Sequence, residues 1–188
     1  QYLVSTEKTE AIDICTRQLK TARNMTEESA ALRELVFSGS ARAKESKESS
    51  LLAFYQKWKS EPLVVDLWLG IQASCPLEGT LSKVKELMQH ESFDLKIPNR
   101  VRALISQFAS SNFVNFHNIS GDGYKFLGDR VAELNEINPQ IASRLMVPLT
   151  RWRKYDETRQ DMMKRELARI LEIKSLSSDV YEIASKSL

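Results

Sequence analysis

The sequence predicts an all-α fold, a superhelical array of antiparallel helix pairs of the armadillo or HEAT kind. Its composition favours helix, because only 6 glycines and 5 prolines occur among 188 residues that are 42% hydrophobic and 28% charged. Apolar residues recur at helical spacing in most segments, and no segment makes a convincing strand. Helix–turn–helix pairs recur roughly every 30–40 residues without a tight fixed-period repeat. We expect residues 1–188 to form a single all-helical domain.

The first quarter of the chain predicts two helices and a polar connection. We expect the first helix over Thr6 to Arg23. Thr26 is expected to be the N-cap of the second helix, because its side-chain oxygen can accept a hydrogen bond from a free backbone N–H. The segment Ser38 to Ser50 is small and polar, which predicts a surface loop in part, although Ala41 to Lys47 could extend the next helix backwards.

The middle of the chain carries three helix starts. Pro62 opens a helix whose run Leu63 to Ile71 is apolar almost all round, which is typical of a central helix covered on several sides. Thr80 is expected to cap a helix over Leu81 to Gln89. Pro98 then opens the next helix, since proline lacks the N–H that would be unpaired at the first helical position.

The last third of the chain predicts a series of helices separated by turns. Ser120-Gly121-Asp122-Gly123 is a clear break, and Pro148 should end or kink the helix that precedes it. The expected helical segments are Phe113 to His117, Gly123 to about Asn135, a short helix opened by Pro139, roughly Asp156 to Glu172, and about Ser178 to Lys186.

Two arginines follow Pro98 on opposite flanks of one helix. The apolar residues Val101, Leu104 and Ile105 define its buried face. At roughly 100° per residue, Arg100 and Arg102 lie about 160° apart, one on each side of that face. They cannot easily serve the same site, so we expect one to face solvent and the other to face whatever this helix helps to enclose.

The residues alone predict no active site in this chain. His90 and His117 are far apart and have no second ligand at i+3 or i+4, so capping a loop is the more natural role for each than binding a metal. Cys15 and Cys75 lie in apolar helical patterns and are interpreted as buried free thiols. No zinc motif of the H-E-x-x-H kind, phosphate-binding glycine loop or nucleophile elbow occurs.

The net charge and the hydropathy of the chain argue against two classes of partner, nucleic acid and membrane. A formal net charge of +2 is too weak a bias to indicate nucleic acid. No window approaches the roughly 18 continuous apolar residues of a membrane span, so no membrane partner is expected. The chain begins at Gln1 without a methionine, so we expect a piece of a longer protein. Its two cysteines make no disulfide framework, which fits a cytoplasmic origin.

The three tryptophans differ in context. Trp58 and Trp68 fall on apolar helix faces, which predicts core packing. Trp152 lies between Arg151 and Arg153, in the locally basic segment that ends at Tyr155. It could stack on these arginines, sit at an interface with another domain, or pack at the edge of the core.

Several longer motifs come in a familiar order. They are Asn24-Met25-Thr26, Trp68 to Ala73, His90-Glu91-Ser92-Phe93, Pro98 to Ile105, Phe116-His117 before Gly121 to Tyr124, Asn138 to Leu145, and Arg153-Lys154-Tyr155-Asp156. Together they resemble the C-terminal domain of bacterial aminopeptidase N, the zinc-dependent alanyl aminopeptidase family. The resemblance covers essentially the whole chain, with one departure at Ile97, where the family often has asparagine.

The resemblance implies a multidomain enzyme that releases N-terminal amino acids from peptides. Its zinc would be held by an upstream catalytic domain, so this fragment alone should bind no zinc and cleave nothing. The domain would pack on the catalytic domain and the rest of the same enzyme, and would enclose a cavity that admits peptide substrates.

The resemblance also implies two substrate-binding residues. By position in the matching motifs, Arg102 and Arg144 would face the cavity and orient the carbonyls or the C-terminal carboxylate of the peptide. Neither would be catalytic, and Arg100 would take a flank or ion-pair role.

A second hypothesis comes from a different class of protein. A free-standing helical-repeat scaffold could bind a partner protein or peptide in its concave face. The gene discriminates between the two, because an H-E-x-x-H motif some hundreds of residues upstream supports the enzyme and a start codon just before Gln1 contradicts it.

Overall fold

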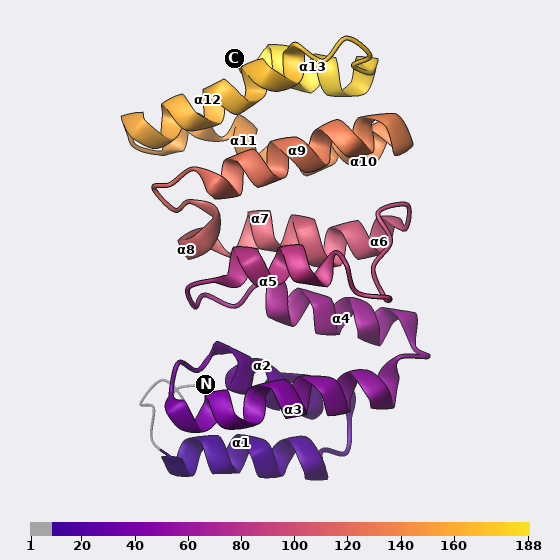
Figure 1. Cartoon of the computed structure of the whole chain (residues 1–188), viewed down its shortest axis with the longest axis vertical. Coiled ribbons are helices and arrows are strands. Elements are labelled where there is room, and N and C mark those ends of the chain that lie inside the picture. The colour runs from indigo at the N-terminus through magenta and orange to yellow at the C-terminus, as the bar shows by residue number, and fades with distance from the viewer. Residues whose placement is uncertain (1–8) are drawn as a thin grey trace.

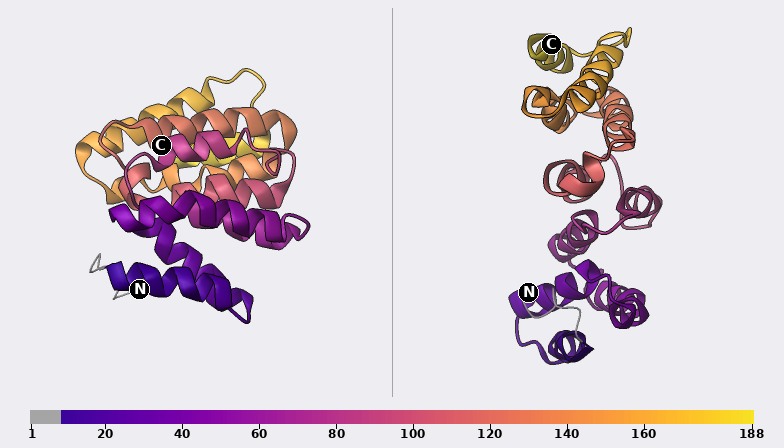
Figure 2. Two further views of the ribbon diagram at one scale, coloured as in Figure 1. Left: turned by 60° about the horizontal axis from the view of Figure 1, so that its bottom comes forward. Right: turned by 90° about the vertical axis from the view of Figure 1, so that its left-hand side faces the viewer.

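The protein is a stack of helices with α1 at one end of the long axis and α12 and α13 at the other (Figure 1). The structure, a computed structural model, describes residues 9–188, and no strand occurs among them. Seen along the helices, the array forms two staggered columns (Figure 2, right). The predicted all-α superhelical fold class is therefore confirmed for the described part of the chain.

The elements follow one another with short connections. They are α1 Thr9–Thr21, α2 Met25–Phe37, α3 Ala41–Trp58, α4 Pro62–Ala73, α5 Thr80–Leu87, α6 Pro98–Val101, a π-helical turn η2 Arg102–Ser106, α7 Gln107–Ser111, α8 Phe113–Phe116, α9 Asp122–Ile137, α10 Pro139–Leu145, α11 Val147–Thr150, a 3₁₀ turn η3 Trp152–Lys154, α12 Glu157–Leu171 and α13 Ser178–Ser187. The predicted first helix began at Thr6, and its residues 6–8 lie outside the described part.

One continuous hydrophobic core runs through most of the array. It extends from Leu32 in α2 to Ala184 in α13, and each layer is formed by helices that are close in sequence. A small second cluster joins α1 to α2 and α3: it contains Ile12 and Cys15 of α1, Leu35 of α2 and Ala43 of α3. Leu69 and Ile71 of α4 are almost completely buried, as the all-round apolar pattern predicted for a central helix.

The proline starts were predicted correctly, but two caps were not. Pro62, Pro98 and Pro139 each occupy the first turn of a helix. Helix α2 is capped by Asn24, whose side chain accepts from the Glu27 N–H; Thr26 already lies inside the helix. The reason is that asparagine caps at least as well as threonine and comes first in the chain.

The start of α5 is also different from the prediction. Gly79 precedes the helix with a positive φ of 84°, a conformation that glycine adopts without steric cost. The Thr80 hydroxyl points back into the preceding turn, where it donates to the carbonyl oxygens of Cys75 (2.9 Å) and Leu77 (2.8 Å). Thr80 thus closes the α4–α5 turn and does not cap the helix.

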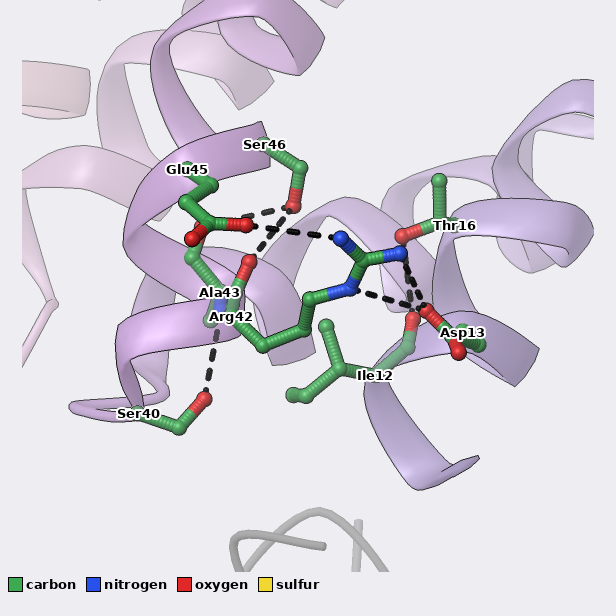
Figure 3. A network of polar contacts seen from close by, with 8 residues as sticks. All are labelled: Ile12, Asp13, Thr16, Ser40, Arg42, Ala43, Glu45 and Ser46. Atoms are coloured by element: carbon green, nitrogen blue, oxygen red, sulfur yellow. Dashed lines mark hydrogen bonds and ion pairs between the residues drawn. The ribbon is translucent and has the colours of Figure 1, made fainter. Parts of the chain in front are cut away.

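The polar segment from Ser38 to Ser50 is mostly helical. The predicted surface loop is therefore wrong for most of it, and the alternative, a backward extension of the next helix, is confirmed. Ser40 caps α3 by accepting a hydrogen bond from the Ala43 N–H, and the helix begins at Ala41. Arg42 then contacts Asp13 of α1 at 3.1 Å and Glu45 at 3.4 Å (Figure 3). The Arg42–Asp13 pair links α3 to α1 through side chains that are exposed to solvent.

The helix that starts at Pro98 contains a π-helical turn. The Gln107 N–H donates to the carbonyl oxygen of Arg102, five residues back. Helix α4 packs against this turn, with Gly70 at the contact, where a Cβ would lie 3.5 Å from the Ala103 carbonyl oxygen, an ordinary van der Waals distance. Turns of this type widen a helix locally and are frequent at functional sites.

Both cysteines are buried, and two of the tryptophans differ in burial. Cys15 and Cys75 are buried free thiols, as predicted. Trp68 is buried and donates to the Leu51 carbonyl oxygen at 3.1 Å, whereas Trp58 is half-buried and donates to Glu28. Within residues 9–188, no helix has the length and apolar character that a membrane crossing requires.

Candidate functional site

Arg100 is a structural clamp. Its guanidinium forms an ion pair with Asp66, and it also donates to the carbonyl oxygens of Ser92 and Pro62, both at 2.8 Å. The Arg100 and Asp66 side chains are only 12% and 16% exposed. Arg100 therefore fixes the chain before α6 to the start of α4, which confirms the ion-pair role expected for it.

Arg102 is exposed and lies at the first position of the π-helical turn. Its one polar contact among the described residues is a hydrogen bond from Nη1 to Asn99 Oδ1, at 2.9 Å. That neutral contact leaves the positive charge of Arg102 uncompensated. Ser106, four residues further along the same helix, lines a cleft between α7–α8 and α10–α11.

Arg144 lines a cleft of about 240 Å³ between α7–α8 and α10–α11. Figure 1 shows α8 and α11 on the same side of the array. The lining residues are Ser106, Ala109, Ser110, Phe113, His117, Arg144, Leu145, Val147, Pro148, Arg151 and Tyr155. The cleft is thus positively charged and half apolar, and the structure places Arg144 in it while Arg102 lies outside its lining.

A buried polar network forms one wall of this cleft. His117 Nδ1 lies 2.8 Å from the Tyr124 hydroxyl, and His117 Nε2 lies 2.9 Å from the Tyr155 hydroxyl. The imidazole stacks on the Tyr155 ring with centroids 4.2 Å apart, and Arg159 donates to the His117 carbonyl oxygen at 2.8 Å. These bonds join α8, α9, η3 and α12 at one point.

Burial governs the titration of the network. Burial, with a smaller contribution from the positive charge of Arg159, lowers the pKa of His117 from 6.5 to about 4. Burial also raises the pKa of Tyr124 to about 12. Both side chains are therefore neutral at pH 7. Through its two hydrogen bonds, His117 connects the loop after α8 to α9 and to η3, in line with the loop role expected for it.

No cluster of three or more metal-ligating side chains occurs within the described part of the chain. The nearest polar partners of His90 and His117 are hydroxyls: Ser92 for the former, and the two tyrosines for the latter. These residues do not fit a zinc site of the usual three or four ligands.

Arg151, Ser106 and Tyr155 were not predicted as site residues. The signal for Arg151 is its spacing, because residues seven apart share one face of a helix and Arg144 and Arg151 are seven apart. The expected break at Pro148 hid this relation. In the structure the break is only Met146, which keeps helical dihedral angles between α10 and α11.

Trp152 packs at the edge of the core and also stacks on a cation. Its indole N–H donates to the Ser187 carbonyl oxygen at 2.9 Å, and Arg153 lies over its ring at 4.0 Å. Packing at the core edge and stacking on an arginine are therefore both confirmed for Trp152. The third alternative, a role at an interface with another domain, remains a prediction.

Comparison with known protein families identifies a helical-repeat domain, in agreement with the fold. The family DUF3458_C, described as a domain of unknown function with ARM repeats, matches residues 1–188. The chain belongs to this family.

Relatives of this DUF3458_C domain are aminopeptidases. The chain is 45% identical to aminopeptidase N of Haemophilus influenzae over 73% of its length, and 41% identical to that of Caulobacter vibrioides over 89%. It is 39% identical to aminopeptidase N of Escherichia coli over 93% of its length. The chain spans only 16%, 19% and 20% of these relatives.

A solved structure agrees with the fold of this DUF3458_C domain. The crystal structure of Legionella pneumophila aminopeptidase A in complex with aspartic acid superposes on 99% of the chain with a TM-score of 0.91 and 35% identity. The chain covers 21% of that protein. The predicted resemblance to the aminopeptidase N group is thereby confirmed at the level of the family.

Proposed function

We propose that this chain is the C-terminal domain of a zinc aminopeptidase that releases N-terminal amino acids from peptides in the bacterial cytoplasm. The observation that carries the proposal is the identity of 39–45% to three enzymes named aminopeptidase N, over 73–93% of the chain. The zinc and the catalytic residues would lie in the remainder of the enzyme, and this domain alone would be inactive.

The domain would contribute an enclosing wall and a substrate-binding surface. The small share of each relative that the chain covers supports a role as one domain among several. A rigid helical array that packs over a catalytic domain can exclude bulk solvent and orient a substrate, which are ordinary contributions of a scaffold to catalysis. The partners would be the other domains of the enzyme and its peptide substrates.

Arg102 and Arg144 would bind the peptide. Both are exposed, neither has a carboxylate partner among residues 9–188, and Arg144 lines a cleft. Guanidinium groups bind carbonyl and carboxylate oxygens through paired hydrogen bonds, which suits orientation of a peptide and does not require a proton transfer.

Kinetics of the full-length enzyme test this role. We expect Arg102→Ala and Arg144→Ala to raise KM for short peptides by about tenfold, the loss of about one charge-assisted hydrogen bond. The effect of each variant on a minimal aminoacyl amide should be much smaller, because that substrate does not extend toward the arginines.

Arg17→Ala is the matched control, because Arg17 is exposed on α1, at the end of the array that is distant from the cleft. An unchanged KM for peptides in both test variants would contradict the assignment. Absence of an H-E-x-x-H motif upstream in the gene would contradict the enzyme itself and favour the free-standing repeat scaffold.

A further inference from the structure

We propose that Arg151 and Arg144 together bind the C-terminal carboxylate of a short peptide, so that Arg151 is a specificity-determining residue. The inference rests on the proposed function, because it assigns a subsite of the same cleft. The motif resemblance already implies a peptide carbonyl or carboxylate for Arg144, so the new element is Arg151, which lines the same cleft, together with the choice of the carboxylate. The argument rests on which arginines of the chain already have polar partners.

Most arginines of this chain are already occupied. Within residues 9–188, only four guanidinium groups lack a hydrogen bond, an ion pair and a ring contact: Arg17, Arg23, Arg144 and Arg151. Arg17 is exposed on α1, and Arg23 is exposed two residues beyond its end. The other two line one cleft.

The charge of these two arginines is not compensated within the cleft. Its lining contains no aspartate or glutamate. The nearest acidic residue in sequence, Asp156, is held by Arg159 at 2.7 Å. Two unpaired guanidinium groups in a partly apolar cleft attract an anion, and their planar geometry favours a carboxylate.

Further donors and the shape of the cleft fit the end of a peptide. The hydroxyls of Ser106 and Ser110 line the cleft, and neither makes a hydrogen bond within the described part of the chain. Phe113, Leu145 and Pro148 provide apolar walls. A volume of about 240 Å³ accommodates a carboxylate with one amino-acid side chain and is too small for a folded partner.

The backbone that carries Arg151 is held in place. The Trp152 indole anchors the following turn to the Ser187 carbonyl oxygen, and the Tyr155 hydroxyl is bonded to His117. The Arg151 N–H itself donates to the Pro148 carbonyl oxygen. A guanidinium on a fixed turn loses less conformational entropy on binding than one on a mobile loop, so the backbone of the site is preorganised.

The experiment compares peptides that differ only at their C-terminus. The full-length protein encoded by the gene is assayed with tri-, tetra- and pentaalanine, each as the free acid and as the C-terminal amide. We expect the free acid to be preferred by about tenfold in kcat/KM for at least one length. Arg151→Gln should reduce this ratio to near one, whereas the matched control Arg23→Gln should leave the ratio unchanged.

A third peptide identifies the source of the carboxylate. An alanine peptide that ends in glutamate amide carries its only carboxylate on a side chain. Selection of this peptide over the free acid of alanine would overturn the assignment to the terminal carboxylate. A wild-type ratio near one at every length, or a ratio that Arg151→Gln leaves unchanged, would also overturn it.

Failure of the proposed function has a separate signature. If the full-length protein hydrolyses none of the peptides, the proposed function fails, and calorimetric titration of the same peptides then gives the ratio of Kd values directly. A free-acid preference that is lost in Arg151→Gln would support the carboxylate site in that case, and a ratio near one in the wild type would overturn it. Arg151 is exposed and its guanidinium makes no hydrogen bond, ion pair or ring contact with residues 9–188, so the variant is expected to fold.

Discussion

At the scale of single residues, His117 is the most constrained polar group of the cleft wall. Both ring nitrogens have hydroxyl partners, and the residue is only 8% exposed. A neutral imidazole donates through one nitrogen and accepts through the other, so two tyrosine hydroxyls satisfy it completely. Protonation would place a charge in this buried site beside Arg159.

The stability of the protein should therefore depend on pH through His117. The folded pKa of about 4 lies below the unfolded value of 6.5, so the unfolded state binds the proton first as the pH falls. The stabilisation is fully present above pH 6.5 and is lost as the pH falls from 6.5 to about 4. We expect a loss of about 2 kcal/mol between pH 7 and pH 5. Urea denaturation at the two pH values, followed by tryptophan fluorescence, measures it.

His117→Gln is the control for this pH dependence, because glutamine does not titrate and can still donate and accept a hydrogen bond. The variant should be less stable than the wild type at pH 7, and its free energy of unfolding should change less between pH 7 and pH 5. An equal pH dependence in both proteins would show that other groups cause the loss.

At the scale of elements, close backbone approaches set how the helices pack. Gly123 lies in the first turn of α9, and a Cβ at this position would overlap the backbone of Phe116 in α8. Gly70 lies in α4 against the π-helical turn, and a Cβ there would only make ordinary van der Waals contact. Two helical glycines with the same intrinsic propensity therefore have different tertiary environments.

This difference predicts opposite effects of one substitution. Gly123→Ala should destabilise the protein by about 3 kcal/mol, because the backbone of α8 must move away from α9. Gly70→Ala should be neutral or stabilising by up to about 1 kcal/mol, because alanine has the higher helix propensity and fits the space. Thermal unfolding followed by circular dichroism compares the two variants, and equal destabilisation would contradict the packing described for them.

At the scale of the whole molecule, each layer of helices makes most of its contacts with the layers next to it in the array. Each layer packs on those before and after it, so the terminal layer has a neighbour on only one side. The α1 layer depends on the small second cluster around Ile12, Cys15 and Leu35, whereas α4 lies in the main core. Stability should accordingly decrease from the centre of the array toward α1.

Hydrogen exchange measures this gradient. We expect the amides of α4 to exchange at least about 100-fold more slowly than those of α1, because opening α1 disrupts fewer buried contacts. Exchange followed by mass spectrometry on the 188-residue chain resolves the two helices as separate peptides. Equal protection in α1 and α4 would indicate that the array unfolds as one cooperative unit.

The sequence by itself determined the helical class, the proline-opened helices and the burial of both cysteines, because these follow from local periodicity and the geometry of single residues. It also placed Arg100 and Arg102 on different flanks of one helix. The π-helical turn at Arg102, the Thr80 bonds and the Ser40 cap were not predicted, since each depends on competition between neighbouring hydrogen bonds.

Only the tertiary structure decided which arginines share a cleft. Arg144 and Arg151 line one cleft together with Ser106, Phe113 and Tyr155. These residues are more than 30 positions apart from first to last in the chain, and they meet because α7–α8 pack beside α10–α11. Sequence spacing reports which residues face the same way along one helix. It does not report which helices become neighbours, because that is fixed by the burial of apolar surface between them.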